Sequence, residues 1–123
     1  MAMANVTTVT SNVITWTIGD HGSSGTDWRL GAASPNGIGC SGGILCRRIQ
    51  FCATAANDII RIQQSTDGLS SGGALLWRCL SSGQYDDNFL EFDPPMRIFP
   101  VIDVSSCTLG GTSGTGLVIF YLV

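Results

Sequence analysis

The last seven residues of the chain, Leu117 to Val123, are all apolar and read LVIFYLV. A strand sends successive side chains to opposite faces of its sheet, so a strand made of these residues is apolar on both faces. The segment is far too short for a membrane-spanning helix, which needs about 20 residues. Its branched and aromatic residues, which follow a Gly-Thr-Gly turn signal, favour a buried strand. We expect one face to pack on the core and the other to meet a second layer or a neighbouring subunit. The residues expected at a subunit contact are Leu117, Ile119, Tyr121 and Val123.

The composition indicates one domain with an unusually uncharged surface. The chain has 123 residues, which suits a single domain over 1–123 with one core. Charged residues make up 12%, about half the usual fraction of roughly 25%. Buried contacts in assemblies are depleted of charge in this way, and the alternative is a lone β domain with a hydroxyl-rich surface. The net charge of −3 gives no basic footprint for nucleic acid.

The cysteines and the start of the chain predict synthesis in a cytoplasm. Five cysteines leave one unpaired even if the others bond. Free cysteines commonly behave as small buried hydrophobes, and reduced thiols are typical of a cytoplasm. The start, MAMANVTTVTSN, has neither a positive nor an apolar stretch of the kind found in a secretory signal. We therefore expect free thiols, no export and no membrane association.

The first third of the chain predicts a short arm, a strand and a long loop. We expect the arm at 1–5. The segment Val6 to Ile18 is rich in Thr, Val, Ile and Trp and predicts one long strand or a strand with a bulge, whose core face holds Ile14, Trp16 and Ile18. The Gly- and Ser-rich stretch 19–43 predicts a loop, and loops of this length are usually functional or mobile.

The rest of the chain is a series of short β segments divided by turn signals. Segments 44–55 and 59–64 are joined by Asn57 and Asp58 and are expected to form a hairpin. Further strands are expected at 74–80, 89–92 and 96–105, the second of them closed by Asp93-Pro94-Pro95. Because helical periodicity is not sustained over ten residues, the sequence predicts an all-β fold. That fold is a single antiparallel β-sandwich or jelly roll of about seven or eight strands.

The patterns that could carry catalysis or hold a cofactor are weak. His21 is the only histidine, and the chain lacks the pattern that would support a Ser-His-Asp site around it. No two cysteines have the close spacing of a zinc site. Residues 37–42 match G-x-G-x-x-G, but a predicted strand follows them where a dinucleotide site needs a helix. We predict no enzyme activity, no metal and no cofactor.

Two loop features could bind a ligand. Asp86 and Asp87 could hold calcium, although a polar turn explains them better. Trp28 and Tyr85 are both expected in loops, where aromatic rings could stack on a sugar. A glycan-binding module of a phage tail or fibre therefore stays open as the alternative function.

The second half of the chain resembles a known group of proteins. The segments that carry the likeness are RRIQFCATAANDIIRIQQ, GGALLW, LEFDPPMRI, VIDVSSCTL and GTGLVIFYL, within 47–123. In spacing they resemble the small capsid decoration, or cement, proteins encoded by tailed phages. The resemblance implies a jelly-roll or β-sandwich protomer that forms a homotrimer on the outer capsid surface of the virion. It also implies the major capsid protein as partner and stabilisation of the head as function.

The residues that would meet the shell are expected near the N-terminus. The resemblance does not extend to the first 45 residues, so the choice falls on the N-terminal arm and strand and on the 19–43 loop. The candidates for contact with the capsid are Val6, Thr8, Asp27, Trp28 and Arg29.

Overall fold

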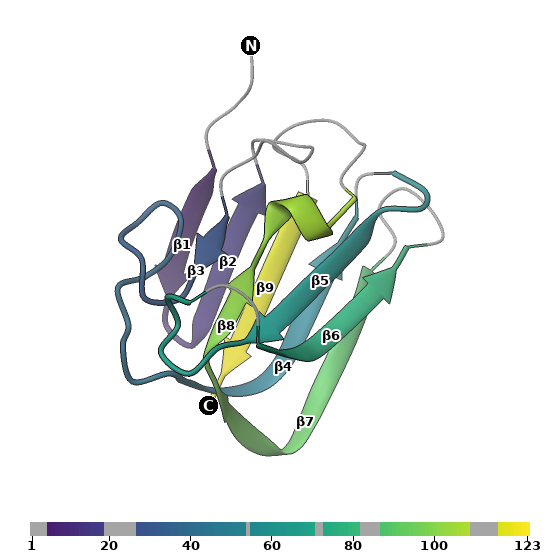
Figure 1. Ribbon diagram of the computed structural model, residues 1–123. Coiled ribbons are helices and arrows are strands. Elements are labelled where there is room, and N and C mark those ends of the chain that lie inside the picture. The colour runs from purple at the N-terminus through teal and green to yellow at the C-terminus, as the bar shows by residue number, and fades with distance from the viewer. Residues whose placement is uncertain (1–4, 19–26, 54, 71–72, 82–86, 109–115) are drawn as a thin grey trace.

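The chain folds into two antiparallel β-sheets packed face to face (Figure 1). The computed structural model describes residues 5–18, 27–53, 55–70, 73–81, 87–108 and 116–123. Nine strands and one short 3₁₀ helix lie within these ranges, which is more strands than the seven or eight we expected. The predicted all-β class and the sandwich of antiparallel sheets are confirmed.

The larger sheet has five strands in the order β1-β2-β9-β4-β7. All neighbours in this sheet are antiparallel. The terminal apolar strand β9 lies in the middle of the sheet, between β2 and β4. The strands are β1 (Val6–Thr10), β2 (Val13–Ile18), β9 (Gly116–Leu122), β4 (Ile44–Cys52) and β7 (Asp87–Ile98).

The smaller sheet has four strands in the order β3-β8-β5-β6. The 3₁₀ helix Val104–Ser106 follows β8, and Thr108 then bridges back to Ile59 at the start of β5. The strands are β3 (Trp28–Arg29), β8 (Pro100–Ile102), β5 (Ile59–Gln64) and β6 (Ala74–Leu80).

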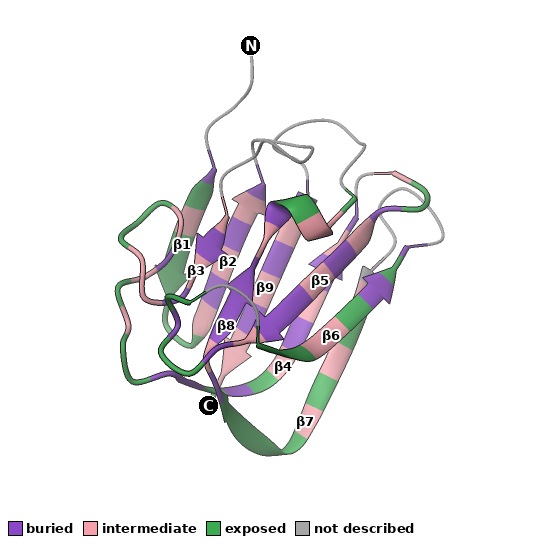
Figure 2. Cartoon of the chain, viewed as in Figure 1, coloured by how far each residue is buried: buried purple, intermediate pink, exposed green. Residues whose placement is uncertain are grey.

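The core lies between the two sheets, and buried residues alternate along the strands that face it (Figure 2). On β2 the three residues predicted for the core, Ile14, Trp16 and Ile18, are all fully buried. On β9 the inward set is Val118 and Phe120, which confirms that one face of the terminal strand packs on the core. Burying this apolar surface supplies the main drive for folding.

The first predicted strand is wrong as one element, because the chain turns back within it. Ser11 and Asn12 form a two-residue loop between β1 and β2, with Thr10 paired to Val13. Ser11 has a positive φ of 52°, the left-handed backbone that tight hairpin loops require. Ser and Asn are ordinary turn residues, but the flanking Thr- and Val-rich run masked that signal.

The predicted hairpin of 44–55 and 59–64 is also wrong. β4 belongs to the five-stranded sheet and β5 to the four-stranded sheet, so the connection crosses from one layer to the other. Ile49 on β4 and Ile62 on β5 both point into the core from opposite sheets. The short connection between the strands, in which Asn57 has a φ of 68°, suited either arrangement.

The described part of the predicted 19–43 loop is more ordered than a loop. It contains β3, which pairs Trp28 with Ile102 and Arg29 with Val101. Asn5, which we expected in a free arm, is 5% exposed, and its side chain donates a hydrogen bond to Asn36 in this segment. The segment is therefore attached to both sheets.

Candidate assembly surface

The side of the five-stranded sheet that faces away from the core is the main candidate surface, and we call it the open face. Its centre is a row of cross-strand neighbours in which Thr15, Ile119, Gln50 and Phe89 follow one another across β2, β9, β4 and β7. Among the described residues no element lies over this row (Figure 1). Phe89 is 56% exposed, and Ile119 is half-buried.

Polar side chains hold the aromatic rings of the open face in place. Tyr121 donates its hydroxyl to Gln50 Oε1 at 2.6 Å. The Arg48 guanidinium lies 5.0 Å from the ring centre of Phe89 and 5.7 Å from that of Tyr121. Its Nη2 also donates to Glu91 Oε1 at 3.0 Å. A guanidinium stacked on aromatic rings adds a modest cation–π attraction, so these side chains form a preordered surface.

The four residues predicted for a subunit contact lie where that contact would need them. Leu117, Ile119 and Tyr121 are half-buried on the open face, and Val123 is 63% exposed at its end. Whether another subunit covers them stays a prediction. Two capsid-contact candidates, Val6 and Thr8, are exposed on β1 at the edge of the same sheet.

The other three capsid-contact candidates differ sharply in exposure. Trp28, expected in a loop, is fully buried, stacks on Phe120 at 5.3 Å between ring centres, and donates its indole N–H to Thr7. It offers no surface to a partner. The side chain of Arg29 is 13% exposed and that of Asp27 is 41% exposed, so only Asp27 remains well placed for an outside contact.

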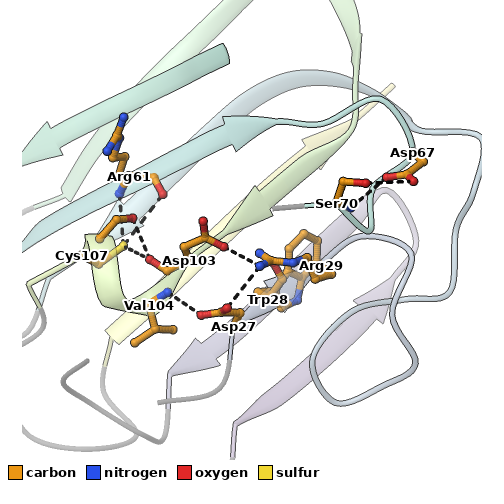
Figure 3. Close-up of polar contacts among 10 residues, drawn as sticks. Asp27, Trp28, Arg29, Arg61, Asp67, Ser70, Asp103, Val104 and Cys107 are labelled. Atoms are coloured by element: carbon orange, nitrogen blue, oxygen red, sulfur yellow. Dashed lines mark hydrogen bonds and ion pairs between the residues drawn. The ribbon is translucent and has the colours of Figure 1, made fainter. Parts of the chain in front are cut away.

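Asp27 and Arg29 belong to an ion-pair cluster on the four-stranded sheet that the sequence did not indicate (Figure 3). Arg29 Nη2 lies 3.2 Å from Asp27 Oδ2 and 2.5 Å from Asp103 Oδ1. Asp27 Oδ1 also accepts the backbone N–H of Val104 at 2.8 Å. Asp27 and Arg29 lie beside and in β3, and Asp103 and Val104 lie at the start of the 3₁₀ helix, more than 70 positions later. The β3–β8 pairing brings the two segments together.

Two of the thiols, those of Cys46 and Cys107, lie in surroundings that favour the protonated form. Burial raises the pKa of Cys46 to about 11, against partial compensation from hydrogen bonds. Burial also raises the pKa of Cys107, whose sulfur contacts the backbone of Arg61 and Asp103. Because the thiolate is the reactive form, neither thiol is suited to nucleophilic chemistry. None of the five cysteines forms a disulfide, and their reduced state in a cytoplasm stays a prediction.

The described parts of the chain contain no pocket and no group of three His, Cys, Asp or Glu side chains that could hold a metal ion. Residues 37–42 lie in a loop before β4, and Cys40 in that loop donates its thiol to the Gly43 carbonyl. His21, Tyr85 and Asp86 lie outside the described residues. No helix in the described residues has both the length and the apolar character needed to cross a membrane.

Comparisons with protein-family models, with curated proteins and with solved structures found no match to this chain.

Proposed function

We propose that this chain is a virion structural protein that decorates the outer surface of a phage head as a homotrimer and stabilises it. The observation that carries the proposal is the open face, where Leu117, Ile119 and Tyr121 are half-buried and no described element forms a layer over them. Copies of the chain meet through this face, and the major capsid protein is the partner of the assembled unit. An apolar face that two proteins bury together has the character of a core cut in half.

The strand order supports the jelly-roll part of the proposal. With β1 set aside, the sheets read β2-β9-β4-β7 and β3-β8-β5-β6. From β2 onward every pair of consecutive strands except β5 and β6 lies in opposite sheets, as in two interlocked Greek keys. Viral capsid proteins are among the proteins that use this architecture, although fold alone does not establish function.

A trimer would hold a shell together through repeated weak contacts. Three copies of one attachment surface bind with a high effective concentration once the first is engaged. A protein that binds the assembled shell but not its separated parts stabilises the shell by mass action. The exposed Val6, Thr8 and Asp27 are the capsid-contact candidates that the fold leaves accessible.

The test is to mix purified protein with undecorated heads and to measure co-sedimentation and heat resistance. We expect the protein to sediment with the heads and to raise the temperature at which they release their contents. Light scattering of the protein alone should give the mass of three chains. A protein that neither binds nor protects the heads would sink the proposal.

The glycan-binding alternative is weaker than the sequence suggested. It relied on Trp28 and Tyr85 as exposed aromatic residues. The Trp28 ring lies in the core and cannot stack on a sugar. Binding of the isolated protein to a glycan array would revive this alternative.

A further inference from the structure

Two edge strands that follow each other in the chain lie on the same side of the sandwich. β6 ends the four-stranded sheet and β7 ends the five-stranded sheet (Figure 1). Leu80 on β6 is 55% exposed, and Phe89 on β7 is 56% exposed. Exposed apolar edge strands are templates for pairing with another chain, so the hydrogen-bonding groups on these edges are worth locating.

On β6 the free backbone groups belong to Leu80 and Arg78. The N–H and C=O of Ile59 are both used by Thr108, at 2.8 and 2.9 Å, on the side of β5 away from β6. Ile59 and Leu80 are therefore a pair without mutual hydrogen bonds. In an antiparallel ladder such pairs alternate with bonded ones, so Arg61 and Arg78 form the next pair of this kind. The N–H and C=O of Leu80 and Arg78 point to the free edge.

On β7 the free backbone groups belong to Phe89 and Glu91. Leu122 on β9 donates its N–H at 2.7 Å to the turn that precedes β2, so the backbone groups of the even-numbered residues of β9 point toward β2. The backbone N–H and C=O groups of the odd-numbered residues therefore point toward β4. Gln50 lies opposite Ile119, so the backbone N–H and C=O of Gln50 point toward β9. On the other side of β4, Phe89 of β7 lies opposite Gln50, and the two form a pair without mutual hydrogen bonds. The N–H and C=O of Phe89, and those of Glu91, point to the free edge of β7.

We propose that β6 of one copy pairs with β7 of a second copy, antiparallel, with Arg78 opposite Glu91 and Leu80 opposite Phe89. In this register all four residues offer their free N–H and C=O groups to each other. All four side chains also lie on the outward side of their sheets. The pairing thus sets a cation against a carboxylate and an aliphatic side chain against an aromatic ring, both favourable across antiparallel strands.

The inward-facing residues of the two edges match in the same register. Trp77 of one copy comes opposite Phe92 of the other, and both are partly buried residues that pack on the edge of their own core. Leu90, also partly buried, comes opposite Cys79. Pairing would therefore join the two cores as well as the two sheets.

The contact is complementary to itself. A two-fold axis parallel to the strands places β6 against β7 twice, once in each pair of sheets, as isologous contacts do. Like edges repel, since β6 carries Arg78 directly opposite Arg61 while residues 87–93 of β7 include three carboxylates. The pairing of β6 with β7 joins copies of the chain and does not require a phage head. Where the open face already joins three copies, the edges link one trimer to the next.

Charge reversal across the pair tests the register. Sedimentation velocity over a range of protein concentrations should show the smallest wild-type species, one chain or a trimer, associating further as the concentration rises. R78E places two carboxylates opposite each other at both contacts, and we expect association to weaken about tenfold. The double variant R78E/E91R restores opposite charges across the contact and should associate more tightly than R78E or E91R alone, although E91R also removes the partner of Arg48 within one copy. R97E is the matched control, because Arg97 is exposed on β7 beyond the paired stretch and donates to Gly42.

Amide hydrogen exchange supplies a second measurement. As the protein concentration rises, the amides of Arg78, Leu80, Phe89 and Glu91 should become protected. The Leu90 amide, which points to β4 inside one copy, should not change. Association that R78E leaves intact, or that the double variant fails to restore, would overturn the register. A chain that shows no concentration-dependent protection at these amides would overturn the pairing itself, whatever it does on phage heads.

Discussion

The two sheets differ in how far the apolar residues on their outward faces are buried. On the four-stranded sheet, Val101 points away from the core and is nonetheless fully buried. Arg29, directly opposite on β3, is nearly buried and is paired with Asp103. On the five-stranded sheet, Ile119 and Tyr121 also point away from the core, yet they stay half-exposed. The chain closes one outward face around β8 by itself and leaves the other open.

The difference shows which outward face one copy closes by itself and which face we propose a second copy to cover. On the four-stranded sheet, Arg29 is paired across strands with the buried Val101 and meets two carboxylates, which fixes this surface within one chain. On the open face the equivalent cation, Arg48, stacks on rings and pairs with an exposed Glu91, so it arranges the apolar residues without covering them. Scattered exposed apolar residues need no explanation, but a contiguous row of them marks an interaction site.

The largest expected effect comes from breaking the closed face. R29M keeps much of the apolar stem of the side chain but removes the charge between Asp27 and Asp103. We expect the free energy of unfolding to fall by about 2 to 3 kcal/mol, because a nearly buried carboxylate loses its partner. Urea denaturation measures this change.

The matched variant on the open face is R48M. The side chains of Arg48 and Glu91 are 35% and 54% exposed, and exposed pairs contribute about 0 to 1 kcal/mol. We therefore expect R48M to change the free energy of unfolding by less than 1 kcal/mol. Equal losses for R29M and R48M would show that the two faces do not differ as described.

The sequence predicted the features that depend on local alternation and missed those that depend on distant pairing. Ile14, Trp16 and Ile18 could be assigned to the core because strand periodicity is visible within six residues. Trp28 could not, since β3 is only two residues long and exists through its pairing with β8. The Arg29–Asp103 pair was invisible for the same reason.

The open face was predictable only in part. The apolar character of Leu117 to Val123 showed that the terminal strand had two apolar faces. Its position in the middle of a sheet, and the neighbours Gln50 and Arg48, followed from pairings that no local pattern reveals. Register between distant strands is set by the whole fold, which is also why the expected β4–β5 hairpin failed.

A smaller effect is expected from I119S on the open face. Because Ile119 is half-buried in one copy, we expect the isolated chain to lose about 1 kcal/mol of folding free energy. Light scattering should show a shift from three chains toward one if the apolar contact of Ile119 lies between copies, as we propose. T15S changes the cross-strand neighbour of Ile119 and is the control, with little effect on either quantity. A loss of folding free energy as large as for a core residue would mean that this face is already closed.

The smallest effect is expected on the side that the chain closes by itself, in the turn Ser65–Ser70. Asp67 accepts the backbone N–H groups of Leu69 and Ser70 at 2.8 and 2.9 Å, and these bonds lower the pKa of its carboxyl below the ordinary value of 3.8. A depressed folded-state pKa means that the charged carboxylate stabilises the fold above the unfolded-state pKa, and that this contribution is lost as the pH falls through the folded-state value. We therefore expect wild type and D67N to differ in melting temperature by a small, constant amount at neutral pH, and the difference to shrink below about pH 4.

The turn also joins the β3 segment, because Gly31 donates its N–H to the Gly68 carbonyl at 2.9 Å. Protonation of Asp67 should therefore loosen the closed side and leave the open face unchanged. A melting difference that does not vary with pH would mean that the carboxylate charge has no part in holding this turn.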